Sequence, residues 1–398
     1  MPDLLSIDQA RAAVLEHVRP LGAEELPVDQ ALGRHLAADV VAAADVPGFR
    51  NSAMDGFAVR SGPAGRTLAV VGESRAGAPF GGTVHDGQAI RISTGAALPD
   101  GTDAVLQVEL AEEDRQTGTV TLGDDAPAGR NVREPGEDVR AGETVLRAGE
   151  LLGPAGLGVA VAAGRGHVAC RIAPTLAILT TGDELVPPGE PLGPGQLHNS
   201  NAVTLAALAR RAGGRVVVVH SVADRADATR AGIAQALAAA HVVILSGGVS
   251  VGPHDHVKGA LAHLGVREVF WRVALRPGKP TWFGTYDGRL VFGLPGNPVS
   301  SMVTFLLFAR PALVALQGGD PRLRRERARL AVDVERSEGR DECVRVHLED
   351  GVATPTGDQA SHRLSSMLGA DALALVPRGD GALAAGSEVE VELLGGWA

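Results

Sequence analysis

The chain has 398 residues, a formal net charge of −10 at pH 7, and 45% hydrophobic but only 3% aromatic residues. This length exceeds what one core supports, so about two to four domains are expected. The scarcity of aromatic side chains disfavours a base-stacking nucleic-acid surface, and the negative charge disfavours binding to nucleic acid or an acidic membrane. No nucleic-acid or membrane partner is expected, and an anionic ligand would need a local basic pocket.

Cysteine usage and the first residues bear on the compartment. Cys170 and Cys343 are far apart and form no CxxC pattern, so we predict two buried, reduced thiols in a cytoplasmic protein. The N-terminus carries an acid at Asp3 and no basic region, which is unlike a signal peptide. The apolar stretch 151–163 is interrupted by glycine and proline, so it predicts no transmembrane helix.

The first part of the chain mixes helical and extended patterns. Ser6 and Gln9 form a capping box that predicts a helix ending at Pro20, and a second helix is expected over 28–36, with Gly33 as a weak point. Residues 45–140 are rich in glycine and in short alternating runs (67–71, 88–92, 104–108), which predicts a small β domain. The stretch 141–173 has a short helical pattern near 157–162 and is expected to rejoin residues 1–44, so the β domain would be an insertion.

Residues 174–318 alternate between strand and helix patterns, which predicts a parallel sheet with helices on both faces. The expected strands are 176–180, 216–219, 242–246 and 290–294, and the expected helices are 203–211, 225–240, 256–264 and 299–316. Residues 322–329 (RLRRERAR) are interpreted as a charged linker. The remainder of 319–398 is expected to form a second, barrel-like β domain, for example with a strand at 388–393.

Ligands of open α/β sheets bind at the carboxyl ends of the strands. Three loops there, 180–185, 246–255 and 294–300, are therefore candidates for binding. Glycines in the middle loop let backbone N–H groups approach an anion, although the loop lacks the GKS or GKT of a P-loop. The only two lysines of the chain, Lys258 and Lys279, lie in Gly/Pro-rich loops nearby, where a compact point charge suits an anion.

Carboxylates accompany these loops. Asp183 and Glu184 lie in the first, Asp255 lies in the second, and Asp224 follows the strand at 216–219. Beside a phosphate-like ligand such carboxylates commonly hold Mg²⁺, so Glu184, Asp224 and Asp255 are the candidate metal ligands. Helix N-capping is an equal alternative for Asp183 and Asp224.

Two loops of the predicted β domain also have a functional appearance. NSAMDGFAV, at 51–59, contains the tight-turn pair Asp55-Gly56, and RISTGAALPDGTDAV, at 91–105, contains Thr94. Taken alone, either turn could be structural.

These segments together resemble the molybdopterin molybdenumtransferase family, the molybdenum-insertion enzymes that include the E domain of gephyrin. The matching pieces run in the family's order over nearly the whole chain: NSAMDGFAV, RISTGAALPDGTDAV, REPGEDVRAGE, ILTTGDEL, HNSNAVTLAALARRAGG, SGGVSVGPHDHVK, RPGKPTWFG, FGLPGNPVSS and RLSSMLGADALALVP. The patterns above divide the chain into 1–44 plus 141–173, 45–140, 174–318 and 319–398, and the resemblance agrees with this multidomain α/β and β architecture. It also implies an elongated homodimer whose cleft combines the α/β domain of one subunit with the β domain of the other.

The implied activity is the last step of molybdenum-cofactor synthesis, in which molybdenum from molybdate enters adenylylated molybdopterin and AMP is released with Mg²⁺ present. By resemblance, the catalytic residues are Asp55, Glu184, Asp255 and Lys279. The residues expected to bind substrate are Thr94, Asp224, Ser246, Gly247, Gly248, Ser250, Lys258, Arg276, Pro295, Gly296, Asn297, Pro298, Arg345 and Ser361. Arg276 departs from the family, where many members have lysine.

Two other functions stay open at this point. A molybdopterin adenylyltransferase shares the α/β domain and would consume ATP, while a catalytically inactive scaffold of the same fold would bind a partner instead. The adenylyltransferase and molybdoenzyme chaperones are also expected as partners of an insertion enzyme.

Overall fold

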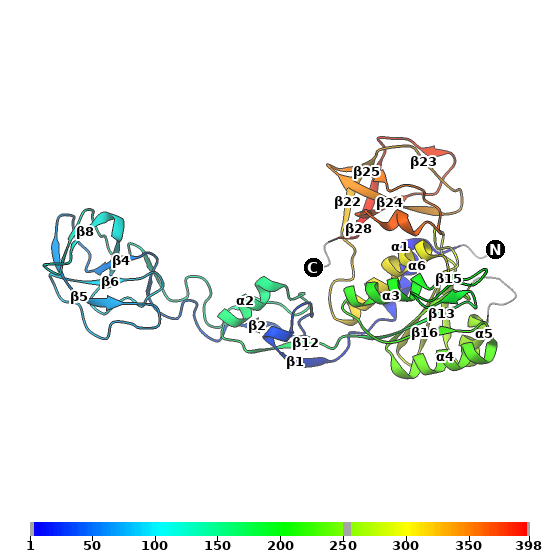
Figure 1. Ribbon diagram of the computed structural model, residues 1–398, viewed down its shortest axis with the longest axis horizontal. Helices are drawn as coiled ribbons and strands as arrows, with labels where there is room; N and C mark the ends of the chain where they lie inside the picture. Colours follow the sequence, from blue (N-terminus) through cyan, green and yellow to red (C-terminus); the bar gives the residue numbers. More distant parts are fainter. Residues whose placement is uncertain (1–3, 250–255, 396–398) are drawn as a thin grey trace.

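A computed structural model describes residues 4–249 and 256–395. The molecule is elongated (Figure 1), with a β domain at one end, a slender middle part, and an α/β domain at the other end beside a C-terminal β barrel. The predicted multidomain architecture of α/β and β parts is confirmed. The residue bounds proposed for the four domains stay predictions.

The α/β domain is built on a six-stranded sheet of order β16-β13-β17-β21-β20-β18. Its strands are β13 (Thr175–Thr181), β16 (Arg215–Val222), β17 (Val242–Ser246), β18 (Arg267–Trp271), β20 (Trp282–Tyr286) and β21 (Arg289–Leu294). The expected strands pair in parallel, but β20 is antiparallel to both β21 and β18. The predicted parallel sheet is therefore confirmed for its four expected strands, and β18 and β20, which precede β21 in the chain without crossover helices, extend its edge in antiparallel fashion.

Helices cover both faces of this sheet, as predicted. Alternating side chains of β13 explain this: Ile178 packs into a core with helices of one face, and Leu179 packs into a core with helices of the other. The first face carries α1 (Ile7–Glu16), α3 (Ser200–Arg211), α6 (Pro298–Thr304), the π-helical turn η3 (Phe305–Ala309) and α7 (Arg310–Leu316). The second face carries α4 (Ala226–Ala239) and α5 (Val257–His263).

The continuous helical run Pro298–Leu316 is a long, strongly apolar helix. An 18-residue window within its 19 residues has a mean hydropathy of 1.8, and 78% of that window is buried inside the protein. By length and composition it could cross a membrane, but its burial is that of a core helix. The stretch 151–163, considered above for this role, forms only the nine-residue helix α2 (Pro154–Ala162), which is too short to cross a membrane.

The N-terminal helix begins where the sequence predicts. The Oγ of Ser6 accepts a hydrogen bond from the Gln9 N–H, and the Gln9 side chain accepts one from the Ser6 N–H, at 3.2 and 2.9 Å. The second predicted helix, 28–36, is wrong. Only the 3₁₀ turn η1 (Val28–Gln30) forms, because Gly33 adopts a left-handed φ of +73° and Leu36 pairs with a distant strand instead.

The slender middle part is assembled from two separate stretches of chain. Antiparallel pairs join β1 (Ala23–Pro27) to β12 (His167–Arg171) and β2 (Val40–Val41) to β11 (Thr144–Leu146). The predicted return with a short helix is confirmed as α2 (Pro154–Ala162). Helix α1, by contrast, packs against α7 in the α/β core.

The inserted β domain contains a six-stranded sheet of order β7-β4-β6-β5-β9-β8, which confirms the three predicted runs. Its strands are β4 (Gly56–Val59), β5 (Thr67–Ser74), β6 (Gln88–Ile92), β7 (Ala104–Gln107), β8 (Ala111–Asp114) and β9 (Thr119–Leu122), with the turn η2 (Val108–Leu110). The short pair β3 (Asn51–Ser52) and β10 (Val132–Arg133) connects this domain to the rest.

The C-terminal domain is a five-stranded barrel that closes through a pairing of β24 with β26. Its strands are β22 (Arg325–Leu330), β24 (Asp341–Glu349), β25 (Val352–Pro355), β26 (Ala372–Val376) and β28 (Glu388–Leu393). Short elements complete the chain: β14 (Leu185–Val186), β15 (Leu197–His198), β19 (Leu275–Arg276), β23 (Val334–Glu335), β27 (Ala382–Leu383) and the turn η4 (Leu364–Met367).

The charged linker predicted at 322–329 is wrong from Arg325 onward, because those residues are part of strand β22. Ala328 and Leu330 point into the barrel core. Arg327 and Arg329, which alternate with them, are exposed, and Arg327 pairs with Glu388 on the neighbouring strand at 2.8 Å. The alternation of charged and small residues is thus that of a barrel strand. Cys170 and Cys343 are both buried and free, as predicted.

Candidate functional site

Loops from the carboxyl ends of β13, β17 and β21 meet around a pocket of about 750 Å³. The first turn of α3 and a loop of the barrel domain complete its wall. The lining residues are Thr181, Glu184, Leu185, Leu197, His198, Asn199, Ser200, Asn201, Ser246, Gly248, Val249, Pro280, Pro295, Gly296, Asn297, Pro298, His362 and Leu364. The start of a helix in this wall adds a partial positive charge that favours an anion.

Asn201 ties two of these loops together. Its Nδ2 donates to the Oγ of Ser246 at 2.9 Å and to the Gly296 carbonyl at 2.7 Å. Ser246 is only 2% exposed, and its Oγ also lies 3.3 Å from the Oγ of Ser301. The Oδ1 of Asn201 is buried and has no hydrogen-bond partner among the described residues, so it is an acceptor available to a ligand that carries a donor.

The glycines after β17 allow the chain to turn sharply beside the pocket. Gly247 and Gly248 have left-handed φ values of +91° and +68°, and a Cβ on Gly248 would stand 2.5 Å from the Cγ2 of Val257. The Gly247 N–H donates to the Leu294 carbonyl at 3.1 Å, so it holds the neighbouring loop. Ser250 and Asp255, predicted in the same loop, lie outside the described residues.

The acidic side of the pocket gathers Asp183, Glu184 and Asp224. The Oδ1 of Asp183 accepts the Asp224 backbone N–H at 3.0 Å, and Glu184 lines the pocket itself. Burial raises the pKa of Asp224, and the neighbouring charges of Asp183 and Glu184 raise it further. The capping alternative is wrong, because α4 begins after Arg225 without a side-chain cap and no helix begins at Asp183.

The described residues contain no group of three or more His, Cys, Asp or Glu that could hold a metal ion. Magnesium, however, is usually bound by one or two carboxylates together with waters and substrate phosphates. Glu184 and Asp224 fit that mode, since a cation between them would offset the repulsion that raises the pKa of Asp224. Asp255, the third candidate ligand, is outside the described residues.

The predicted basic residues lie on different elements, with Arg276 in β19, Lys279 in the turn that follows it, and Lys258 in α5. Arg276 forms an ion pair with Glu342 of the barrel at 3.1 Å, and its side chain is 55% exposed. Lys279 is exposed in the turn that precedes Pro280, a pocket residue, and its carbonyl accepts the Val273 N–H at 3.0 Å. The ammonium of Lys258 lies 3.2 Å from the ring centroid of Trp271.

The barrel domain contributes through one loop. Asn297 donates to the Oγ of Ser361 at 2.9 Å, and the Ser361 carbonyl accepts the Val299 N–H at 3.2 Å. Arg345 is not at the pocket: it is 1% exposed within the barrel, and its guanidinium donates to Ser366 and to carbonyls of the loop that carries Ser361. The structure therefore gives Arg345 a role in holding that loop.

Asp55 and Thr94 lie together but far from this pocket. The Oδ1 of Asp55 accepts the Thr94 N–H at 2.8 Å, and both residues are exposed at the edge of the inserted β domain. Figure 1 shows that domain at the opposite end of the molecule from the α/β domain. The pocket of one chain therefore brings together Glu184, Ser246, Gly248 and Pro295–Pro298 of the predicted residues, without Asp55 or Thr94.

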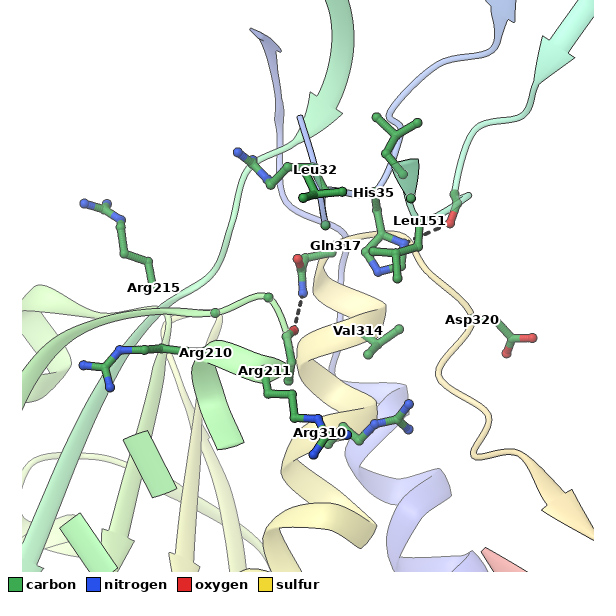
Figure 2. A pocket seen from close by; sticks show the side chains of 18 of the residues that line it. Leu32, His35, Leu151, Arg210, Arg211, Arg215, Arg310, Val314, Gln317 and Asp320 are labelled. Carbon is green, nitrogen blue, oxygen red and sulfur yellow. Dashed lines mark hydrogen bonds between the residues drawn. The ribbon is translucent and has the colours of Figure 1, made fainter. Parts of the chain in front are cut away.

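A larger pocket, of about 970 Å³, lies between the middle part and the amino ends of the sheet strands (Figure 2). It is lined in part by Leu32, Leu151 and the buried Gln317, whose Nε2 donates to the Ala212 carbonyl at 2.8 Å. Arg210 and Arg215 extend to one side, away from Leu151. None of the predicted site residues lines this pocket, so the strand-end pocket remains the candidate site.

Several residues of the site were not predicted as such. Asn199 and Asn201 were not among the predicted site residues, although two asparagines around a serine can supply polar groups to a pocket. Asn199 does cap α3, accepting from the Ala202 N–H at 3.0 Å, but its Nδ2 also reaches Thr180 at 2.7 Å. Trp271 and Arg272 were missed, although a tryptophan beside an arginine is conspicuous in a chain with 3% aromatic residues.

Comparisons with known proteins agree with this geometry. Three family models match in order: the MoeA N-terminal region (domain I and II) at 5–164, a probable molybdopterin binding domain at 177–315, and the MoeA C-terminal region (domain IV) at 327–394. The molybdopterin molybdenumtransferase of Haemophilus influenzae is 39% identical over 79% of this chain and 78% of its own. Molybdopterin molybdenumtransferase 2 of Mycobacterium tuberculosis is 35% identical over 97% of this chain and 98% of its own. The chain belongs to the molybdopterin molybdenumtransferase family.

Solved structures support the same assignment. Two structures of the molybdopterin biosynthesis MoeA protein of Pyrococcus horikoshii, 32% and 28% identical, each superpose with a TM-score of 0.82. They cover 99% and 98% of this chain and all of their own. The family resemblance drawn from the sequence motifs is confirmed, and with it the assignment of this chain to a family of transferases in molybdenum cofactor biosynthesis.

Proposed function

We propose that the protein inserts molybdenum from molybdate into adenylylated molybdopterin and releases AMP. The observation that carries this proposal is the strand-end pocket, where the loops of the molybdopterin-binding region meet in a chain that matches molybdopterin molybdenumtransferases along nearly its full length. Glycine, serine and asparagine in its wall suit a ligand with phosphate groups, which the backbone and short polar side chains can approach closely.

The chain's own residues have separable tasks in this reaction. The loops at Gly248 and at Pro295–Pro298 hold the phosphate and nucleotide end of the substrate. Lys279, Lys258 and Arg276 face the same edge and stabilise the negative charge that grows as the phosphoanhydride breaks. The dithiolene thiols come from the substrate, and burial raises the pKa of the Cys343 thiol, which suits a structural residue rather than a nucleophile.

Magnesium is proposed as the cofactor, held by Glu184 and Asp224 with Asp255. When bound, the cation supplies Lewis-acid stabilisation of the phosphate oxygens. The carboxylates at and beside the pocket support this assignment, because burial and the like charges of Asp183 and Glu184 raise the pKa of Asp224. Substitution of Asp255 by Asn is expected to weaken the Mg²⁺ dependence of the reaction, and an unchanged Mg²⁺ titration would reject Asp255 as a ligand.

A homodimer is proposed because Asp55 and Thr94 are remote from the pocket of their own chain (Figure 1). In a dimer, the β domain of one subunit would bring them over the pocket of the other, where Asp55 would orient the molybdate or a proton transfer. A complementation test follows: inactive Asp55→Asn and Lys279→Ala chains, mixed and refolded together, should regain about a quarter of wild-type activity if random pairing forms half heterodimers with one intact site each. Mixtures that stay inactive would contradict a shared site.

The compartment and further partners are proposed from the same reaction. Two buried free thiols suit the reducing cytoplasm. A molybdopterin adenylyltransferase would supply the adenylylated substrate, and molybdoenzyme chaperones would accept the product.

Product analysis tests the function against its nearest alternative. Purified protein, adenylylated molybdopterin, molybdate and Mg²⁺ should give AMP and a metallated pterin. Transfer of the adenylyl group from ATP to molybdopterin, with pyrophosphate released from the ATP, would instead indicate an adenylyltransferase, and binding without turnover would indicate a scaffold.

A further inference from the structure

Trp271 ends β18 at the same edge of the sheet as the candidate site. Strand β18 is antiparallel to β20, which is antiparallel to β21, so β18 and β21 both end at this edge. The indole Nε1 of Trp271 donates to the Val249 carbonyl at 3.2 Å. Val249 lines the pocket and is 1% exposed, so this bond anchors the pocket wall to the edge of the sheet.

Two cations lie against the same indole. The Nζ of Lys258 is 3.2 Å from the ring centroid, and the Cζ of Arg272 is 4.1 Å from it. Both distances are well within the range of cation–π attraction, for which tryptophan is the strongest partner. Lys258 belongs to α5 and Arg272 directly follows β18, so one side chain gathers basic groups from two elements.

The backbone of Arg272 adopts a conformation that is rare for a residue with a side chain. Its φ is +81°, a left-handed conformation that is unfavourable for a residue with a side chain. The Arg272 N–H donates to the Thr281 carbonyl at 2.9 Å, and the next residue, Val273, donates to the Lys279 carbonyl at 3.0 Å. These bonds hold the turn that directs Arg272 over the ring and link it to the loop of Lys279. Strain of this kind persists where surrounding contacts impose it, often at functional sites.

We propose that Trp271 is a positioning residue that holds Lys258 and Arg272 ready for a tetrahedral oxyanion at the edge of the pocket. Lysine and arginine lose considerable rotamer entropy on ordering, and a ring that orders them in advance lowers that cost when the anion binds. The cation–π contact leaves the positive charge in place, so both groups still attract an anion. The inference rests on the proposed function, which supplies two such anions: the phosphate of the nucleotide end and molybdate.

The lysine content of the chain makes a direct test possible. Only Lys258 and Lys279 would appear in an NMR spectrum of protein labelled with ¹³C-lysine. The ring current of Trp271 should shift the ε-methylene signal of Lys258 upfield, while Lys279 serves as the internal control. In Trp271→Leu the shift should vanish, and in Trp271→Phe, which keeps a ring but loses the bond to Val249, part of it should remain. A wild-type spectrum without an upfield-shifted lysine would overturn the proposal.

Titration with AMP and, separately, with molybdate identifies the anion. Movement of the Lys258 signal with AMP alone assigns the cations to the phosphate, and movement with molybdate alone assigns them to the metal oxyanion. A Lys258 signal that responds to neither anion would overturn the proposal. Trp271→Leu should weaken binding of the responsive anion about 5- to 30-fold, the range given by loss of a partly desolvated cation–π contact.

Lys258→Met, which leaves the Trp271 ring in place, provides a second test in case Trp271→Leu does not fold. If Trp271 acts through Lys258, the double variant should lose little more affinity than either single variant. Fully additive losses would show independent roles and would contradict the proposal. Failure of the proposed function is distinguishable, because a wild-type protein without AMP release could still show the shifted lysine and its response to anions.

Discussion

Replacement of Arg345 by Met should loosen the barrel loop that reaches the candidate site. The Arg345 guanidinium donates to the Oγ of Ser366 through two nitrogens, at 3.0 and 3.2 Å, and to the Asp358 and Ala360 carbonyls at 3.4 and 3.5 Å. These acceptors lie on both sides of Ser361, which contacts Asn297 across the domain boundary. The substitution removes every one of these bonds while keeping a long side chain in the barrel.

The size of the effect follows from this geometry. A hydrogen bond to a charged group contributes about 1.5–3 kcal/mol, but bonds to the carbonyls at 3.4 Å and beyond contribute little. The cost of burying the guanidinium, which lowers the pKa of Arg345, offsets part of the gain. A net loss of about 2 kcal/mol remains, which raises the opening constant of the loop about 30-fold.

Hydrogen exchange of peptides covering 357–366, read by mass spectrometry, measures this opening directly. The matched control is Arg345→Lys, which keeps the charge but cannot reach Ser366 and both carbonyls at once, so it should exchange nearly as fast as Arg345→Met. If both variants keep wild-type protection in this loop and yet bind AMP or molybdate poorly, Arg345 contacts the ligand itself, and its assigned role in holding the loop is refuted.

Three other substitutions test separate parts of the account. Lys279→Ala should lower the rate of AMP release about 10²–10³-fold, as removal of one preorganised electrostatic group does, and turnover within about tenfold of wild type would exclude that role. The fold raises the pKa of Asp224 above its ordinary 3.8, so the ionised carboxylate destabilises the folded protein. Asp224→Asn should therefore raise the free energy of unfolding, measured in urea, at pH 7 but not below pH 3.8, where the carboxyl is protonated in both states. Equal stability of the two proteins at pH 7 would contradict this. Glu392, 1% exposed, accepts from Arg11 and Arg325 at 2.8 Å each; Glu392→Ala should cost about 3 kcal/mol of unfolding free energy by breaking a buried pair, and a loss below about 1 kcal/mol would show the pair to be unimportant.

Local patterns in the sequence were sufficient for much of the α/β domain. Strand β17 and helix α3 follow directly from a buried apolar run and from an asparagine cap, which depend on neighbours in the chain. Where tertiary pairing decides the structure, the sequence misled. The 28–36 segment has helical spacing, but Leu36 lies opposite Cys170 in an antiparallel bridge, and its N–H donates to the Glu150 carbonyl. The sequence of β22 alone resembles a charged linker, because the glutamates of β28 that lie opposite its arginines are distant in the chain.

In the candidate site, too, some residues could be predicted from the sequence and others could not. Glu184, Ser246 and Asn297 follow strands, and the rule that ligands bind at strand ends places such residues near one another without knowledge of the fold. The link from Arg345 to the loop of Ser361 runs through the interior of the barrel, so no spacing in the sequence indicates it. The separation of Asp55 from the pocket likewise depends on how the domains are arranged in space (Figure 1).

Release of AMP from adenylylated molybdopterin by the purified wild-type protein, with and without molybdate in the presence of Mg²⁺, tests the central claim most directly. The account predicts AMP release that depends on molybdate and is accompanied by a metallated pterin in equal amount. AMP release that is absent, or that proceeds equally well without molybdate and leaves the pterin unmetallated, would contradict it.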